Sequence, residues 1–354
     1  MDNKEYLKKL LESFGPSGNE KEAQEVFISY CQESVNKLPY KDHVGNVWFK
    51  LGSNDAKTKI LISAHIDQIA LMVSYIDDSG FVYFISLGGM DRRIVPGSRV
   101  IIKNDRGDYI KGVINKAAVH VEEDDEYEKS MKIADMKVDL GVSSKEEAEK
   151  LVEVGDYIIL ENEANVNFGP NRIVGAALDD RSGVYVVSEL LKRFVLDEKR
   201  LIEKNVQLIF ASCTGEELGL VGAKVLAKEI NPDISIDIDV TFATDDDRAK
   251  KSENGDIKLG EGPVISIGPD KRPELVKKAK EVAKHFDIKY QVEATRCGGT
   301  NTFAIMTNAL NCNTMLISIP CRSMHTTNEV VDWRDLKGAE ELISYLIWNI
   351  VNEG

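Results

Sequence analysis

The sequence predicts an α/β fold in which helices flank a mostly parallel central sheet, with a small β-rich domain inserted into it. Apolar runs typical of buried strands alternate with amphipathic helical patterns in residues 1–70 and 168–354. Residues 71–167 instead carry short alternating strands, several of them separated by glycine turns. Because the chain has 354 residues, it is long enough for two domains. We therefore predict an α/β domain interrupted by a β-rich domain at residues 71–167.

The elements of the α/β domain follow from hydrophobic periodicity. The chain opens with a helical pattern whose apolar face includes Tyr6, Leu7 and Leu10, and the breaker sequence at residues 15–18 ends it. Short apolar runs predict buried strands at residues 59–64, 206–212, 234–242 and 314–319. Amphipathic patterns predict helices at residues 20–30, 179–194, 221–229, 273–286 and 336–351.

The inserted domain is predicted from a different pattern. Alternating segments predict its strands, and the acidic segment 144–152 predicts one helix among them. The predicted strands are residues 81–85, 99–102, 109–114 and 157–160.

Composition narrows the class of protein. The net charge is −14 with no basic patch, so nucleic acid is not an expected partner. No segment approaches the roughly 20 apolar residues of a membrane helix, and the charged N-terminus lacks a secretory pattern. The five cysteines are scattered and form no CxxC pair, which is typical of reduced thiols. We expect a cytoplasmic protein that does not associate with membranes.

Histidine and carboxylate residues recur where the predicted strands end. His65 and Asp67 follow the first strand, and Glu216 and Glu217 follow the second. Asp245 follows the third, His325 follows the fourth, and Asp179 begins a helix. Ligands of open α/β sheets bind beyond the carboxyl ends of the strands, which predicts a shared site there.

Each motif alone has a simpler explanation. Glu216 and Glu217 suit an exposed helix start, and Asp179-Asp180 suits a helix cap. Residues 245–247 suit a solvated acidic loop. The coincidence of five motifs at one edge favours a site instead. Asp67 lies two residues after His65 and projects to the same side, where it can orient the imidazole as a partner of a ligand histidine does.

Two histidines and three carboxylates are ligands suited to zinc or cobalt. A carboxylate that bridges two ions, with one histidine and one carboxylate added to each, gives a two-metal hydrolytic centre. Such a centre polarises a carbonyl and lowers the pKa of bound water. One further carboxylate must stay unligated as general base, and the pair Glu216-Glu217 offers one residue for each role.

The sequence resembles the tetrahedral (TET) dinuclear aminopeptidases, also called glutamyl or deblocking aminopeptidases and cellulase-M-like proteins, family 42 of the metallopeptidases. The resemblance covers nearly the whole chain. It rests on the Gly-Pro-Ser-Gly turn, His-x-Asp, Leu-Asp-Asp-Arg-x-Gly, Glu-Glu-x-Gly-Leu-x-Gly-Ala, Ala-Thr-Asp, Gly-Gly-Thr and Ile-Pro-x-Arg-x-x-His motifs. These stand at residues 15–18, 65–67, 178–183, 216–223, 243–245, 298–300 and 319–325.

The resemblance implies a role for each matched residue. His65, Asp179 and Asp245 would bind one metal; Asp179, Glu217 and His325 would bind the other. Glu216 would be the general base, Asp67 would orient His65, and a cis peptide would join Asp179 to Asp180. The metals would be zinc or cobalt, with manganese possible.

The resemblance further implies substrate contacts from Arg296, Gly298, Gly299, Thr300 and Asn301. The chain departs from the family at Gln68, Ile69 and Ala70, at Asn301, and at residues 246–248, none of which is an inferred ligand. The departures bear on specificity and rate.

We thus predict a metal-dependent aminopeptidase that hydrolyses N-terminal residues from short peptides. The inserted domain would build dimers into a homo-oligomer, a dodecamer in this family. Two alternatives stay open: a related carboxypeptidase or N-acyl deacylase, and an assembly particle with a degenerate site. A glycosidase is disfavoured because glycosidases use a carboxylate pair without metal.

Overall fold

The computed structural model describes residues 1–118, 120, 131–246 and 249–353. The chain divides into two compact units, which we call the α/β unit and the barrel unit. The α/β unit comprises Met1–Asp67, Ala164–Met324 and Asn328–Gly354, and the barrel unit comprises Gln68–Glu163 and His325–Thr327. Asp247 and Arg248, where the sequence differs from the family's usual motif, lie outside the described residues.

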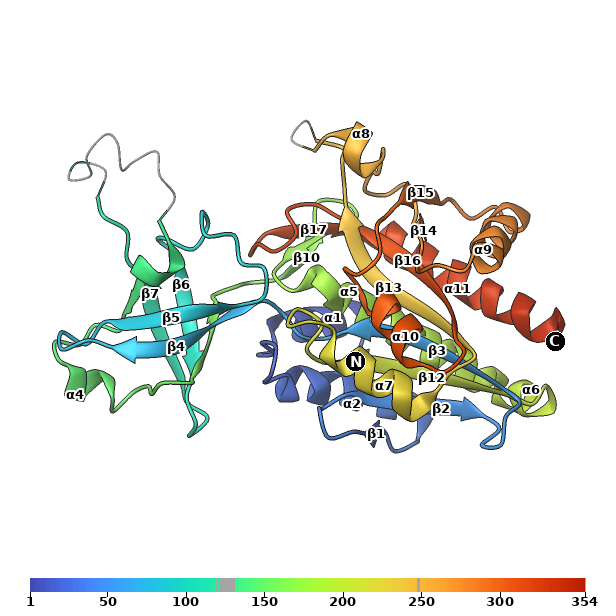
Figure 1. The fold of residues 1–354 in the computed structure, drawn as a ribbon, viewed down its shortest axis with the longest axis horizontal. Coiled ribbons are helices and arrows are strands. Elements are labelled where there is room, and N and C mark those ends of the chain that lie inside the picture. The colour runs from blue at the N-terminus through green and yellow to red at the C-terminus, as the bar shows by residue number, and fades with distance from the viewer. Residues whose placement is uncertain (119, 121–130, 247–248, 354) are drawn as a thin grey trace. The chain divides into compact units, whose positions relative to one another are not determined.

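An eight-stranded sheet forms the centre of the α/β unit, in the order β1-β2-β12-β3-β13-β16-β14-β15 (Figure 1). Its four middle strands run parallel and match the four predicted apolar runs, which confirms the predicted fold class. They are β12 (Val206–Cys213), β3 (Thr58–His65), β13 (Ile234–Phe242) and β16 (Asn313–Cys321). Since the four are parallel, their carboxyl ends lie at one edge, where His65 pairs in register with Cys213.

Shorter strands complete this unit, and the sequence analysis did not predict them. They lie at the margins of the main sheet or in a separate three-stranded antiparallel sheet, where the runs are too short for a clear periodicity. The marginal strands are β1 (Tyr40–Lys41), β2 (Val47–Gly52), β14 (Val264–Ile267) and β15 (Gln291–Ala294). The small sheet contains β10 (Asn165–Phe168), β11 (Arg172–Gly175) and β17 (Glu329–Asp332).

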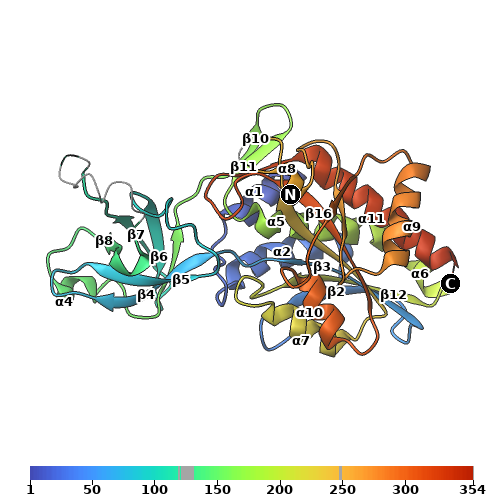
Figure 2. The ribbon, with the colours of Figure 1, turned by 45° about the horizontal axis from the view of Figure 1, so that its top comes forward.

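Helices cover both faces of the main sheet, as Figures 1 and 2 show. The larger core cluster includes side chains of α1 (Asn3–Glu12), α2 (Lys21–Val35), α5 (Leu178–Phe194), α9 (Pro273–His285) and α11 (Trp333–Glu353). A smaller cluster joins α7 (Val221–Ile230) and α10 (Asn301–Asn308) to the other face. Helix α5 is buried almost all round, which places its first turn deep in the unit. Two short helices are α6 (Glu198–Glu203) and α8 (Lys251–Asn254), and η2 spans Val195–Asp197.

The barrel unit is a closed antiparallel barrel in the order β4-β5-β8-β7-β6-β9 around an apolar core. Its strands are β4 (Ala70–Ile76), β5 (Val82–Leu87), β6 (Arg99–Lys103), β7 (Tyr109–Ile114), β8 (Lys137–Asp139) and β9 (Tyr157–Leu160), with η1 at Ile133–Asp135. The predicted acidic helix is shorter than expected: α4 spans Lys145–Ala148. After it the chain forms a turn in which the N–H groups of Leu151 and Val152 both donate to the Ala148 carbonyl.

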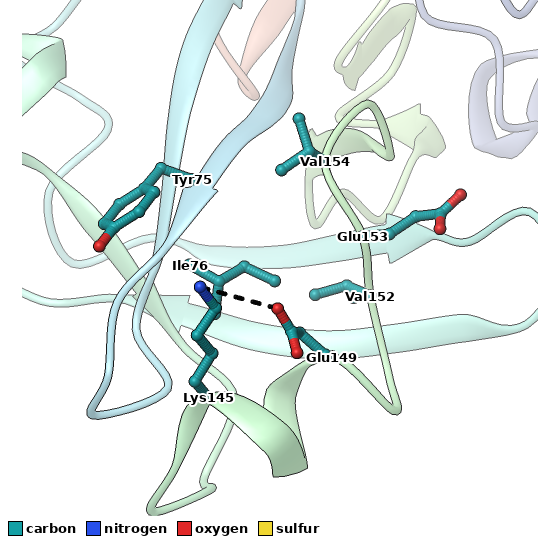
Figure 3. A pocket seen from close by; sticks show the side chains of 7 residues that line it. All are labelled: Tyr75, Ile76, Lys145, Glu149, Val152, Glu153 and Val154. Carbon is teal, nitrogen blue, oxygen red and sulfur yellow. Dashed lines mark ion pairs between the residues drawn. The ribbon is translucent and has the colours of Figure 1, made fainter.

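An open pocket of about 290 Å³ lies on the barrel beside α4 (Figure 3). Lys145 pairs with Glu149 at 3.8 Å across it, and Tyr75 and Val154 line it as largely exposed apolar groups.

Within the described part of the chain, no helix combines the length and the apolar character that a membrane crossing requires.

Candidate metal centre

His65 is the last residue of β3, and its ring is buried. Its Nδ1 lies 3.2 Å from the Asp67 carbonyl oxygen and 3.5 Å from Asp67 Oδ1. Its Nε2 faces three carboxylates: Asp179 Oδ1 at 3.1 Å, Glu216 Oε2 at 3.9 Å and Asp239 Oδ1 at 3.9 Å. A proton on Nδ1 is therefore held by Asp67, which leaves the Nε2 lone pair directed at the carboxylates, where a metal ion would bind.

Asp67 fixes more than the imidazole. Its carboxylate accepts from the Ser17 hydroxyl at 2.6 Å and from the backbone N–H groups of Glu216 at 3.0 Å and Glu217 at 3.2 Å. Burial raises the pKa of Asp67, but hydrogen bonds from His65, Ser17 and Glu216 bring it below its ordinary value. Asp67 is thus an anion that ties His65 to the turn carrying both glutamates.

Asp179 lies at the start of α5, where the backbone of Asp179 and Asp180 is not helical. The peptide bond between them is cis, as predicted. The Asp179 N–H donates to Glu329 Oε2 at 3.1 Å, so β17 also supports the turn. Asp180 accepts from the backbone N–H groups of His65 at 3.2 Å and Gly183 at 3.0 Å. Position 183 has to be glycine, because a Cβ there would lie 2.4 Å from Asp180 Oδ1.

A buried arginine, Arg181, joins this turn to the N-terminal segment. Its Nε donates to the Ile66 carbonyl at 3.0 Å, beside His65. Its Nη1 donates to the carbonyls of Leu10 at 2.7 Å and Ser13 at 2.8 Å, where α1 ends. The guanidinium therefore caps α1 and holds the end of β3 with one rigid group.

Asp239 is a candidate ligand that the sequence analysis missed. It lies within β13, and the donor atoms of His65, Asp180 and Asp239 all lie within 4.8 Å of one another. The signal was present in the sequence: a carboxylate at this position interrupts a buried apolar run, and buried charges require a partner.

Asp245, in contrast, is not brought into the His65 cluster. Its two oxygens each accept from Arg322 at 2.7 Å, and Oδ2 also accepts from the Leu259 N–H at 3.1 Å. Burial raises the pKa of Asp245, but the hydrogen bonds from Arg322 and Leu259 bring this pKa below its ordinary value. This carboxylate is neutralised by Arg322, which directly follows β16.

The electrostatics of the cluster fit a divalent cation. A second group of donor atoms within 4.8 Å of one another belongs to His65, Glu216 and Glu217. Burial raises the pKa of Glu216; the charge of His65 lowers it, and those of Asp239 and Glu217 raise it again. Burial likewise raises the pKa of Asp239. Several buried carboxylates around one imidazole repel one another, and a cation among them would remove that repulsion.

The other predicted site residues have the following positions in the two units. His325 groups with the barrel unit, where its Nδ1 lies 3.0 Å from the Gly89 carbonyl oxygen. Gln68 begins the same unit. The predicted substrate loop divides into two parts. Arg296, Gly298 and Gly299 are exposed, whereas Thr300 is the N-cap of α10 and Asn301, its first residue, is buried.

The fold and the carboxylate-rich histidine site are those of a metallopeptidase, and comparison with known proteins identifies the family. A model of the M42 glutamyl aminopeptidases matches residues 45–342, so this chain belongs to that family. It is a metallo-aminopeptidase, a peptide hydrolase.

Individual relatives agree over nearly the full length. A putative aminopeptidase of Acetivibrio thermocellus is 35% identical over 96% of each chain. The TET aminopeptidase of a Thaumarchaeota archaeon from marine sediment is 30% identical, with a TM-score of 0.90 over 99% of each chain. The TET1 peptidase of Pyrococcus horikoshii is 30% identical, with a TM-score of 0.85 over 98% of this chain and 99% of that one. That peptidase assembles into a tetrahedron or a large octahedral shell, and one TET1 structure holds a dodecamer.

Proposed function

We propose that the protein removes N-terminal residues from short peptides with a centre of two divalent metal ions. The observation that supports this most strongly is the surroundings of His65, whose Nδ1 is held by Asp67 while its Nε2 faces three carboxylates within 4 Å. Nitrogen and carboxylate donors of this kind suit zinc or cobalt, with manganese also possible.

One metal would be held by His65, Asp179 and Asp239, and the other by Asp179, Glu217 and His325. Asp179 would bridge them. We assign Asp239 in place of Asp245, because Asp239 Oδ1 lies 3.9 Å from His65 Nε2 whereas both oxygens of Asp245 are bound by Arg322.

When bound, the metals would polarise the scissile carbonyl and lower the pKa of a water molecule. Glu216 would accept the proton of that water and donate it to the leaving amine. Two contacts support this role: the Glu216 backbone N–H donates to Asp67, and Glu216 Oε2 faces the His65 ring.

For partners, we propose short peptides and further copies of the same chain. The assemblies of the TET1 relatives support a homo-oligomer, with a dodecamer built from dimers as the expected form and the barrel unit as its assembly domain. The cysteines of the chain are free, which favours a reducing compartment such as the cytoplasm.

A panel of aminoacyl-p-nitroanilides, each with and without an N-acetyl block, tests this function. The protein is dialysed against a chelator and then supplied with zinc or cobalt. We expect release of p-nitroaniline only from free-amine substrates and only after the metal is restored. Release of p-nitroaniline from the blocked substrates would contradict an aminopeptidase. No release from any substrate would favour an N-acyl deacylase, which leaves the anilide bond intact, or a degenerate site.

A further inference from the structure

The turn that joins β12 to α7 carries Glu216 and Glu217, yet its first backbone N–H groups are not bound by the backbone. Four consecutive N–H groups donate instead to side chains from the N-terminal part of the chain. They are Thr214 to Asn46 Oδ1 at 2.9 Å, Gly215 to Glu20 Oε1 at 3.1 Å, Glu216 to Asp67 Oδ1 at 3.0 Å, and Glu217 to Asp67 Oδ2 at 3.2 Å. Three side chains from other parts of the chain therefore hold the backbone conformation of this turn.

Of these three acceptor residues, Glu20 lies furthest from the turn in the sequence. Its Oε1 accepts from the Gly18 N–H at 2.8 Å as well as from Gly215, so it joins the Gly-Pro-Ser-Gly segment to the turn. The side chain is buried, and burial raises its pKa to about 7, although hydrogen bonds from Gly18 and Gly215 oppose this. An acid kept at such a cost in desolvation requires an explanation.

The obvious structural explanation, a helix cap, does not account for Glu20. It precedes α2, but its side chain makes no capping hydrogen bond to that helix. The oxygen that would cap α2 is directed at Gly215 instead. Gly215 has φ +59°, a left-handed conformation that a regular strand end would not impose.

We propose that Glu20 is a positioning residue for the reaction: by holding the Gly215 N–H it fixes the turn so that the Glu216 carboxylate faces the His65 ring. This inference rests on the proposed function, in which Glu216 is the base. Glu20 reaches the centre only through the backbone of Gly215, whereas Asp67 also contacts His65 directly. A shift of the base of about 1 Å lowers turnover by about 100-fold.

The test compares three substitutions of Glu20. Glu20→Leu removes the acceptor at similar size, Glu20→Asp withdraws the carboxylate by one methylene, and Glu20→Gln keeps an amide oxygen at the same position. We expect Glu20→Leu to lower kcat by about 10- to 100-fold and Glu20→Asp by at least about fivefold. KM should stay within about twofold, and Glu20→Gln should stay within about threefold of the original kcat, because its oxygen still accepts from Gly215.

Asp335 gives a matched control outside the proposed site. It is buried, and its oxygens accept from the N–H groups of Gly260 at 2.7 Å and Gly262 at 2.8 Å, so it also fixes a glycine turn. Asp335→Leu should lower the melting temperature while kcat stays within about twofold. The visible absorption of the cobalt-loaded protein gives a readout besides activity: it should change in Glu20→Leu, through the displaced turn, and not in Glu20→Gln or Asp335→Leu.

Several results would overturn the inference. One is an unchanged kcat in Glu20→Asp and Glu20→Leu; another is a loss in Glu20→Gln as large as in Glu20→Leu. A third is an equal loss of kcat in Asp335→Leu. If Glu20→Leu does not fold, the comparison of Glu20→Asp with Glu20→Gln decides. Full activity in Glu216→Gln would contradict the proposed function itself, whereas wild-type turnover in the Glu20 variants with an inactive Glu216→Gln contradicts this inference alone.

Discussion

Glu216→Gln is expected to lower kcat on a free-amine aminoacyl-p-nitroanilide by about 1,000-fold, the middle of the range for loss of a general base. The amide cannot accept a proton from water, yet it preserves the shape of the side chain. Because Asp67 holds the backbone N–H groups of Glu216 and Glu217, the turn should keep its position. The metal content should therefore remain at two ions per chain.

The matched control for this variant is its neighbour. Glu217→Gln replaces a proposed ligand, so it should lose metal together with activity. Elemental analysis of both dialysed variants, alongside kcat, separates the two roles. Full turnover in Glu216→Gln, or loss of its metal with retention in Glu217→Gln, would contradict the assignment of base and ligand.

Asp239→Asn is expected to weaken metal binding by more than about 100-fold, because loss of a residue that merely supports a ligand already costs about 10- to 100-fold. The Asp239 carboxylate lies beside His65, and its replacement removes a charge from the centre. Turnover at limiting zinc should fall in parallel. Calorimetric titration of the metal-free protein with zinc measures the change.

Asp245→Asn is the comparison that distinguishes the two aspartates. It breaks a charge pair with Arg322 but leaves the His65 cluster intact, so zinc affinity should stay within about threefold of the original. If Asp245→Asn loses zinc and Asp239→Asn does not, the ligand set inferred from motif resemblance is right and the one proposed from the geometry is wrong.

The difference between Asp239 and Asp245 shows what the sequence could predict. The four middle strands were predictable because they are buried on both faces and their sequences are largely apolar. The gathering of His65, Asp179, Glu216 and Glu217 was predictable, because His65 ends a middle strand, the two glutamates follow another, and Asp179 lies at the start of α5. Asp245 also follows a strand, but the loop conformation that turns it toward Arg322 depends on tertiary contacts.

Asp239, in contrast, lies in the cluster but was not predicted as a ligand. It lies inside β13, and hydrophobic periodicity assigns such a residue to the strand without asking what the carboxylate binds. The hydrogen bonds that Glu20 accepts from Gly215, Asp67 from Glu216 and Glu329 from Asp179 could not be predicted either. Each joins residues at least 149 positions apart in the sequence. Sequence patterns predict elements and their ends, whereas these supports arise only when the ends meet.

Titration of the metal-free protein with zinc, while hydrolysis of a free-amine aminoacyl-p-nitroanilide is followed, tests the central proposal most directly. We expect no turnover without metal, a rise to a plateau at two zinc ions per chain, and no release from the N-acetylated substrate at any point. Two results would contradict a two-metal aminopeptidase centred on His65. One is turnover in the fully metal-free protein, and the other is a zinc-saturated protein that releases p-nitroaniline only from the acetylated substrate.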